Sequence, residues 1–296
     1  MENIKLNTPN YIKKNDLLKL IAIITMVIDH MGYMGIIPQE HYYLSRTIGR
    51  IAFPIFAYYI ALGFQRTSNL KKYISRIAGF ALISQIPYSF FNPELEFHPL
   101  HLNIMFTLLI GLIALLFLER LISSFKEFNS YHHANNLLSL LVYFILTILA
   151  VLSPEIIKTG AHLNGINLHL DYGSYGVLLM ISFYLFKNSK IATVVSFILI
   201  SIIGTYISAY NHILTINGGN IINAFTNEYY LKQYFYSRKH ISSLSGFWFQ
   251  SRSILGLLFI LLSDIWNSID FRMNKYLAYL FYPVHIILLI IIVKVL

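Results

Sequence analysis

A histidine and an aspartate stand side by side in one of the most apolar stretches of the chain. Asp29 and His30 fall within residues 17–36, a run otherwise apolar enough to cross a bilayer as a helix. A carboxylate at membrane depth costs roughly 2.5 to 3.5 kcal/mol, so such a residue is by default a functional candidate that needs a partner. An imidazole exchanges protons near neutral pH. These two side chains are therefore the first candidates for chemistry, with His30 as base or nucleophile.

The partner of Asp29 is predicted on the next apolar segment. Asp29 and His30 do not pair with each other, because neighbouring side chains on a helix diverge by about 100°. Arg50 has a similar predicted depth, and an ion pair with it lowers the cost of both charges in lipid. Two interpretations fit this pair: it holds catalytic groups in place, or it only locks two helices together.

Polar side chains of later segments are predicted at about the same depth in the membrane. Asn103 and Thr107 are one helical turn apart on one face, and Gln85 lies about two turns inside the end of its segment. Tyr282 and His285 interrupt the last apolar stretch. We expect an outward-facing polar cavity, with these five residues as its substrate-binding candidates.

Basic residues gather at the opposite end of the first three segments. Lys19 precedes His30 by eleven residues, about three turns, which places both on one helix face about 16 Å apart. Together with Arg66, Lys72 and Arg76, it forms a candidate site for a cytosolic polyphosphate such as coenzyme A. The alternative is an ordinary cytoplasmic surface, where excess Lys and Arg attract anionic lipid.

The segments that must position these residues are helical and apolar. Of the 296 residues, 56% are hydrophobic and only 12% are charged, which excludes an ordinary water-soluble domain. The fold class we predict is all-α: a polytopic integral membrane helical bundle of about nine to ten transmembrane helices, forming one domain over residues 1–296. The predicted helices span 17–36, 47–64, 73–91, 103–121, 136–153, 173–187, 190–210, 247–263 and 276–295.

The distribution of basic residues predicts the orientation in the membrane. Lys and Arg concentrate on one side of the predicted spans, most clearly over the first four, which indicates a cytoplasmic N-terminus in the cell (plasma or inner) membrane. Residues 211–246 are the weak point, because three basic residues there fall on the predicted outer side. Within them, residues 227–239 resemble a helix that lies in the membrane interface.

Several kinds of chemistry are excluded or disfavoured by composition and spacing. The chain has no cysteine, which removes disulfides, thiolate metal sites and a cysteinyl acyl-enzyme. The loop histidines lack the spacing of a metal site, so no metal is expected. These are His98, His101, His132, His133, His162 and His169. No phosphate-binding glycine loop, dinucleotide fingerprint or serine elbow is present, and no nucleic-acid partner is expected.

Several stretches carry a resemblance to a known family. IAIITMVIDHMG at 21–32 is followed by RTIGRIAFPIFAYYIALGFQRTSN at 46–69, YISRIAGFALISQIPY at 73–88, LNIMFTLLIGL at 102–112, DYGSYGV at 171–177 and YLFYPVH at 279–285. Together these resemble the TraX family of conjugal-transfer membrane proteins, whose founding member acetylates the N-terminus of the F-type pilin. The resemblance is strongest over residues 20–112.

The TraX family is in turn similar to the acyltransferase-3 enzymes and lysosomal heparan glucosaminide acetyltransferase. In acyltransferase-3 proteins a basic residue precedes a first-helix histidine with ten residues between, and Lys19 and His30 match this spacing. The resemblance implies that His30 is the catalytic base or acetyl relay and that Lys19 contributes to binding acetyl-CoA. It also implies an acetyl acceptor such as a pilin N-terminus.

We expect the protein to be a membrane acyltransferase that uses acetyl-CoA and is surrounded by membrane lipids. His30, Asp29 and Arg50 are its predicted catalytic group, and a peptide, lipid or surface glycan is as good an acceptor on chemical grounds. Two alternatives stay open: a proton-coupled transporter, which intramembrane charges and proline-broken helices also describe, and a non-catalytic scaffold for conjugation or secretion.

Overall fold

The computed structural model describes residues 16–131, 134–216, 252–266, 269 and 271–296. The helices are α1 Leu17–Tyr33, η1 Gln39–His41, α2 Tyr42–Gly49, α3 Ala52–Arg66, α4 Leu70–Tyr88, α5 Ile104–Tyr131, α6 Ala134–Leu163, α7 Gly173–Leu185, α8 Lys190–Ile216, α12 Ile254–Leu261, α13 Ser263–Trp266 and α14 Lys275–Val295. Two short strands, β1 His101–Leu102 and β2 His169–Leu170, pair in parallel. The all-α prediction is confirmed.

Each predicted apolar segment contains a helix within the described residues. By length and composition, three helical stretches in that part of the chain are able to cross a membrane: Gln39–Arg66, Ile104–Ser130 and Asn136–Leu163. They are typical of a membrane protein. The predicted total of nine to ten spans is not confirmed by these three. The predicted interfacial helix at 227–239 lies outside the described residues.

A local break separates α2 from α3 at Arg50 and Ile51. Pro54 explains it, because proline lacks the N–H that would bond to the carbonyl of Arg50 four residues earlier. The two helices still form one continuous apolar stretch. The break therefore places Arg50 at a turn, where its backbone N–H donates to the Thr47 carbonyl, three residues earlier.

The buried centre of the molecule is α7, which packs between α3, α5, α6 and α8. Nine of its thirteen residues are buried, and small residues such as Gly173, Ser174 and Gly176 allow the neighbouring helices to come close. Its apolar side chains join those of α3 and α5 in one continuous core. This core holds the N-terminal end of α7 in a fixed place beside α3.

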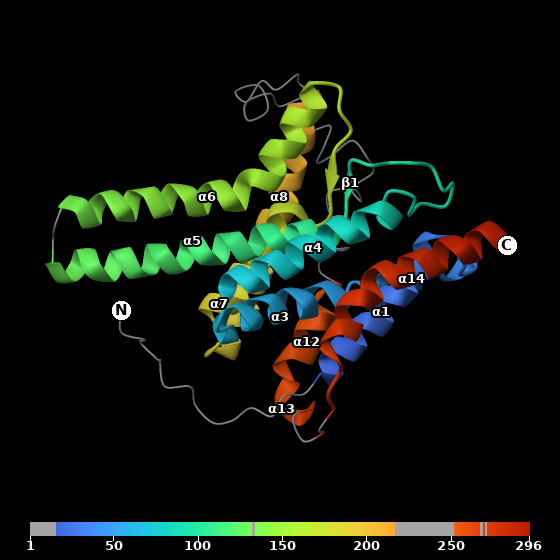
Figure 1. The fold of residues 1–296 in the computed structure, drawn as a ribbon, viewed down its shortest axis with the longest axis horizontal. Helices are drawn as coiled ribbons and strands as arrows, with labels where there is room; N and C mark the ends of the chain where they lie inside the picture. The colour runs from blue at the N-terminus through green and yellow to red at the C-terminus, as the bar shows by residue number, and fades with distance from the viewer. Residues whose placement is uncertain (1–15, 132–133, 217–251, 267–268, 270) are drawn as a thin grey trace.

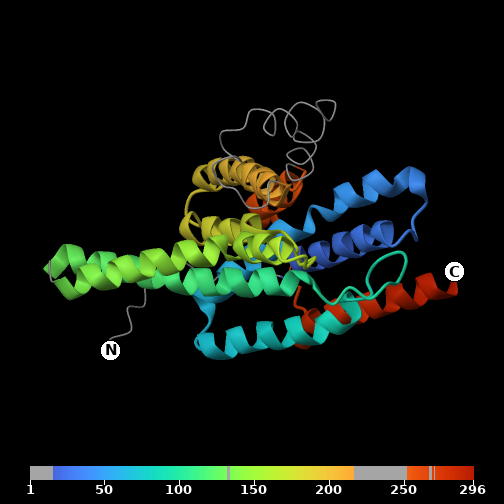
Figure 2. The ribbon, with the colours of Figure 1, turned by 90° about the horizontal axis from the view of Figure 1, so that it is seen from above.

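The longest helices, α5 and α6, form an antiparallel hairpin that extends away from the other helices (Figures 1 and 2). In its most apolar window, α6 is only 11% buried. An apolar helix face of this size is left uncovered where lipid, not water, surrounds it. We therefore assign the outer face of α6 to the membrane.

Two glycines let α1 and α2 approach closely. A side chain at Gly32 would meet the side chain of Ser45, and one at Gly49 would meet the side chain of Asp29. Because Gly49 has no side chain, the Asp29 carboxylate lies directly against the backbone of α2. The last helix, α14, packs on α1 and α4 and so brings the C-terminal part of the chain to the same region (Figure 1).

Candidate active site

A cavity of about 610 Å³ opens among the ends of α1, α2, α4 and α7, and we call it the histidine cavity. Its charged and titratable lining consists of Asp29, His30, Tyr33, Arg46, Arg50, Tyr88, His98, His101, Glu155, Lys158, His169, Asp171, Tyr172, Tyr175 and Tyr282. The convergence of polar groups from separate segments agrees with the polar cavity expected from the sequence. Asp29, His30, Arg50 and Tyr282 all line it.

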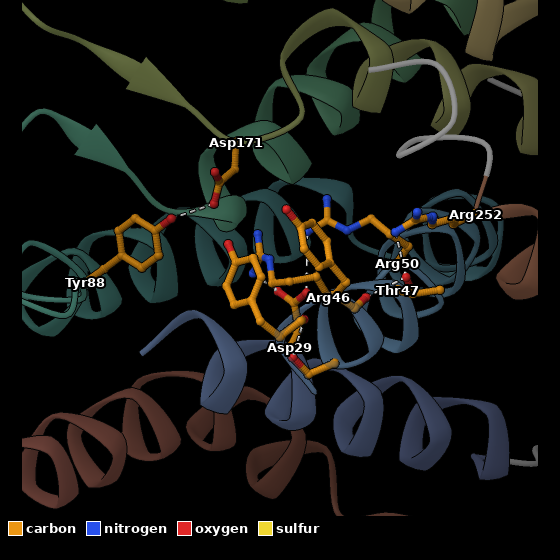
Figure 3. Close-up of polar contacts among 10 residues, drawn as sticks. Asp29, Arg46, Thr47, Arg50, Tyr88, Asp171 and Arg252 are labelled. Carbon is orange, nitrogen blue, oxygen red and sulfur yellow. Dashed lines mark hydrogen bonds and ion pairs between the residues drawn. The ribbon is translucent and has the colours of Figure 1, made fainter. Parts of the chain in front are cut away.

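The Asp29 carboxylate lies between two arginines of α2 and its C-terminal turn (Figure 3). Arg46 Nη1 is 2.7 Å from Asp29 Oδ2, and Arg50 Nη2 is 3.5 Å from Asp29 Oδ1. The predicted pairing with Arg50 is confirmed, but Arg46 makes the shorter contact. The contact of Arg46 with Asp29 was predictable from the sequence, because Arg46 and Arg50 are four residues apart and share one helix face.

Arg50 is also held by aromatic rings. Its guanidinium carbon lies 5.4 Å from the centre of the Tyr172 ring, which stacks on Phe53 with centroids 3.7 Å apart. Tyr172 has a left-handed backbone, with φ of 61°, which is rare for an aromatic residue and is found at functional sites. The packing of α3 against α7 thus fixes the position of one positive charge in the cavity.

A second carboxylate, Asp171, is fixed on the opposite side of the cavity. Tyr88 donates a hydrogen bond of 2.6 Å to Asp171 Oδ2 (Figure 3). Thr107 donates a hydrogen bond to the Asp171 carbonyl. These bonds tie α4 and α5 to the residue that precedes α7. Thr107 therefore anchors the cavity wall; its own side chain does not line the cavity.

Gln85 and Asn103 were also predicted to line the substrate cavity, but neither lines the histidine cavity. Gln85 Oε1 accepts from Asn103 Nδ2 at 2.9 Å, and Gln85 Nε2 donates to the carbonyl of His101 at 2.8 Å. Asn103 is fully buried and also donates to the Ala81 carbonyl. The sequence indicates which helices carry these two residues, but not where their side chains point. Both join α4 to the segment that enters α5.

His30 meets the histidine that interrupts the last apolar helix, α14. His30 Nδ1 is 2.8 Å from His285 Nε2, although 255 residues separate them. His30 lines the cavity, while His285 is buried behind it on α14 and does not. His285 was predicted as a substrate-cavity residue, so the structure corrects this prediction and places it behind His30. Tyr282, one turn earlier on α14, does line the cavity.

Three further histidines form one rim of the cavity. The ring centres of His98 and His101 are 4.9 Å apart, and those of His101 and His169 are 5.7 Å apart. Burial, together with His169 and His98, lowers the pKa of His101. The residues that the structure describes contain no group of three His, Cys, Asp or Glu side chains able to hold a metal ion.

A second cavity, of about 850 Å³, lies at the other end of α1, and we call it the basic cavity. It is lined by one acidic residue, Asp16, and six basic ones: Lys19, Arg66, Arg76, Lys187, Lys190 and Arg272. Lys19 Nζ bonds Asp16 Oδ1 at 2.6 Å and lies over the Tyr59 ring. Lys72 is exposed and does not line this cavity, which separates it from the other three predicted cofactor-binding residues.

Four side chains line both cavities and form the wall between them. They are Met26, Phe56, Ile104 and Tyr282. Met26 is one turn before His30 on α1, and Tyr282 is nearly one turn before His285 on α14. The histidine pair therefore lies directly behind this shared wall, on the side away from the basic cavity.

We predict that Asp29→Leu destabilises the protein by roughly 3 to 5 kcal/mol, because two nearly buried guanidinium groups then face each other without a carboxylate. Thermal unfolding of the purified protein in detergent measures this. The double variant Asp29→Leu/Arg46→Met is the matched control, since it removes one of the two stranded charges and should recover part of the loss. Unfolding of Asp29→Leu at the wild-type temperature would show that the carboxylate does not hold this region together.

Comparisons with known proteins place the chain in a family. The family model described as TraX protein matches residues 14–293. The chain is 32% identical over 107 residues to the probable fimbrial assembly protein FimC, serogroup H1, of Dichelobacter nodosus, which covers 33% of this chain and 44% of that protein. It is 33% identical over 76 residues to protein TraX of Escherichia coli, covering 25% of this chain and 29% of that protein.

The matched regions thus span less than half the length of these two curated relatives. No solved structure gives a significant match. The family model, in contrast, matches nearly the whole chain and includes every helix described above except the last two residues of α14. On that ground the chain belongs to the TraX family.

Proposed function

We propose that this protein is an integral membrane acetyltransferase that moves an acetyl group from cytosolic acetyl-CoA to an acceptor at the outer side of the membrane. The observation that carries the proposal is the pair of cavities on either side of one wall. One cavity is rich in cations, and the other holds His30 beside two arginines. Donor and acceptor thereby have separate compartments that meet at the reactive histidine.

The basic cavity suits a nucleotide polyphosphate. Six cations and one carboxylate give it a positive lining, and arginine and lysine are the usual partners of phosphate. Arg76 Nε is buried there without a hydrogen-bond partner among the described residues, so one donor is left for a ligand. Tyrosine rings at Tyr58, Tyr59, Tyr73 and Tyr279 offer surfaces on which an adenine can stack.

The chemistry at His30 is an acyl transfer. His30 takes the proton from the acceptor amine or hydroxyl as its nitrogen or oxygen attacks the thioester carbonyl. The C–S bond then breaks, the coenzyme A sulfur leaves as a thiolate, and the proton held by His30 neutralises it. Arg50, positioned by Asp29 and Tyr172, is the candidate to stabilise the negative oxygen that develops on the carbonyl.

The acceptor follows from the family and the relatives' names. The TraX resemblance implies a pilin N-terminus, and one relative is named as a fimbrial assembly protein. Asp171 and Glu155 line the histidine cavity and would attract a protonated amine before it reacts. A peptide amine is therefore the acceptor class that we propose first, with a glycan or lipid hydroxyl as alternatives.

A proton-coupled transporter is the second candidate, and the same two cavities favour it. Two cavities that share one wall, with ionisable groups and Pro54 and Pro283 nearby, also describe an alternating-access carrier. A carrier moves its substrate without consuming acetyl-CoA. Measuring thioester loss therefore separates the two candidates.

We predict that purified protein transfers label from acetyl-labelled acetyl-CoA to cell-envelope extract and that His30→Ala loses at least about 100-fold in rate, since general-base catalysis supplies a factor of this size. His162→Ala is the matched control, because His162 is exposed at the end of α6 and lines neither cavity. It should keep the wild-type rate. If the wild type consumes no acetyl-CoA, or if a folded His30→Ala keeps its full rate, the proposal fails.

We also predict that Arg76→Leu raises KM for acetyl-CoA about tenfold while kcat changes little, because the lost contact serves binding and not chemistry. Lys72→Leu is the control, since Lys72 lies one turn away on the same helix but outside the basic cavity. Its KM should match the wild type. Equal effects of both substitutions would mean that only the overall positive charge matters, as expected for attraction to anionic lipid.

A further inference from the structure

The buried histidine of α14 has both ring nitrogens engaged. His285 Nδ1 is 2.9 Å from the carbonyl oxygen of Phe281, four residues earlier on the helix. His285 Nε2 is 2.8 Å from His30 Nδ1. His285 is 4% exposed, so neither contact is shared with bulk water. The proton positions on this ring therefore follow from the two partners.

A carbonyl oxygen only accepts hydrogen bonds, so His285 Nδ1 must carry the proton that lies between them. A neutral imidazole has one N–H, which leaves His285 Nε2 as an acceptor. The opposite assignment would place two lone pairs 2.9 Å apart, and a doubly protonated ring would be a buried cation without a counter-ion among the contacts described for His285.

The same logic then fixes the ring of His30. Because His285 Nε2 accepts, His30 Nδ1 must donate, and His30 Nε2 keeps its lone pair. No residue in the described part of the chain forms a hydrogen bond with His30 Nε2, and His30 lines the histidine cavity. A free imidazole favours the proton on Nε2, so this arrangement reverses the intrinsic preference.

We propose that His285 is a positioning residue that holds His30 in the Nδ1–H tautomer and so leaves Nε2 as the base in the cavity. The proposal rests on the proposed function, because it assigns the proton-accepting atom of that reaction. When His30 Nε2 takes the proton of the acceptor, His30 becomes an imidazolium whose Nδ1–H bond to His285 Nε2 is charge-assisted and stronger. His285 thereby also stabilises the cation that forms during transfer.

Contacts with neighbouring aromatic rings hold the two imidazole rings in position. The His30 and His285 rings are nearly parallel, at 13°, with centres 5.0 Å apart, and His285 stacks on Phe281 at the same centre distance. On its other side, His30 meets Phe91 with ring centres 4.8 Å apart. Both rings are therefore oriented by packing, and the hydrogen bond sets which nitrogen carries the proton.

The test compares His285→Phe, which keeps the stacked ring but has no nitrogen, with His285→Gln, whose side-chain oxygen still accepts from His30 Nδ1. Nitrogen-15 NMR of histidine-labelled protein reads the tautomer, and His30→Ala identifies the His30 signals. We expect Nδ1–H in the wild type and in His285→Gln, and Nε2–H in His285→Phe. Wild-type protein with Nε2 protonated, or an unchanged His30 spectrum in His285→Phe, would overturn the proposal.

The kinetic arm uses the same variants in the acetyl-transfer assay. We expect His285→Phe to lower kcat by about 100-fold or more while KM for acetyl-CoA stays within about twofold, and His285→Gln to recover most of the rate. Equal melting temperatures establish that the variants fold. If the wild type transfers no acetyl group, the proposed function fails, but the NMR comparison still decides whether His285 sets the tautomer. A full rate in His285→Phe would contradict the catalytic role.

Discussion

The ion pairs of Asp29 are the constraint on which the rest of the site depends. A buried carboxylate is tolerated here because Arg46 and Arg50 both reach it, at 2.7 and 3.5 Å. Gly49 makes room for it against α2, and Tyr172 supports Arg50 from the start of α7. The contacts around this one buried charge thus join α1, α2 and α7. His30, the next residue on α1, lines the cavity beside them.

Two kinds of polar group surround the cavities, and they have different roles. Gln85, Asn103 and Thr107 are satisfied by one another and by backbone carbonyls, so they fix the frame. His30 and Arg76, in contrast, each keep a side-chain nitrogen without a hydrogen-bond partner among the described residues, and each faces a cavity. Polar groups of the first kind build the site, while those of the second kind are available to a ligand.

The sequence predicted the apolar segments and the Asp29–Arg50 pair, because helical periodicity and the need of a buried charge for a partner are local properties. Arg46 was within reach of the same reasoning through its four-residue spacing from Arg50. The contact of His30 with His285 was not, because 255 residues and the packing of α14 intervene. The sequence could not predict that Arg76 lines the basic cavity and Lys72 does not, because the two residues are one turn apart on α4.

In the proposed reaction, donor and acceptor meet from opposite sides of the wall formed by Met26, Phe56, Ile104 and Tyr282. The most direct measurement uses sealed vesicles that contain the protein, with labelled acetyl-CoA inside and cell-envelope extract outside. We expect label to reach an acceptor outside, and no transfer when acetyl-CoA and extract are both supplied on the outer side only. Transfer that requires both on the same side would contradict this expectation.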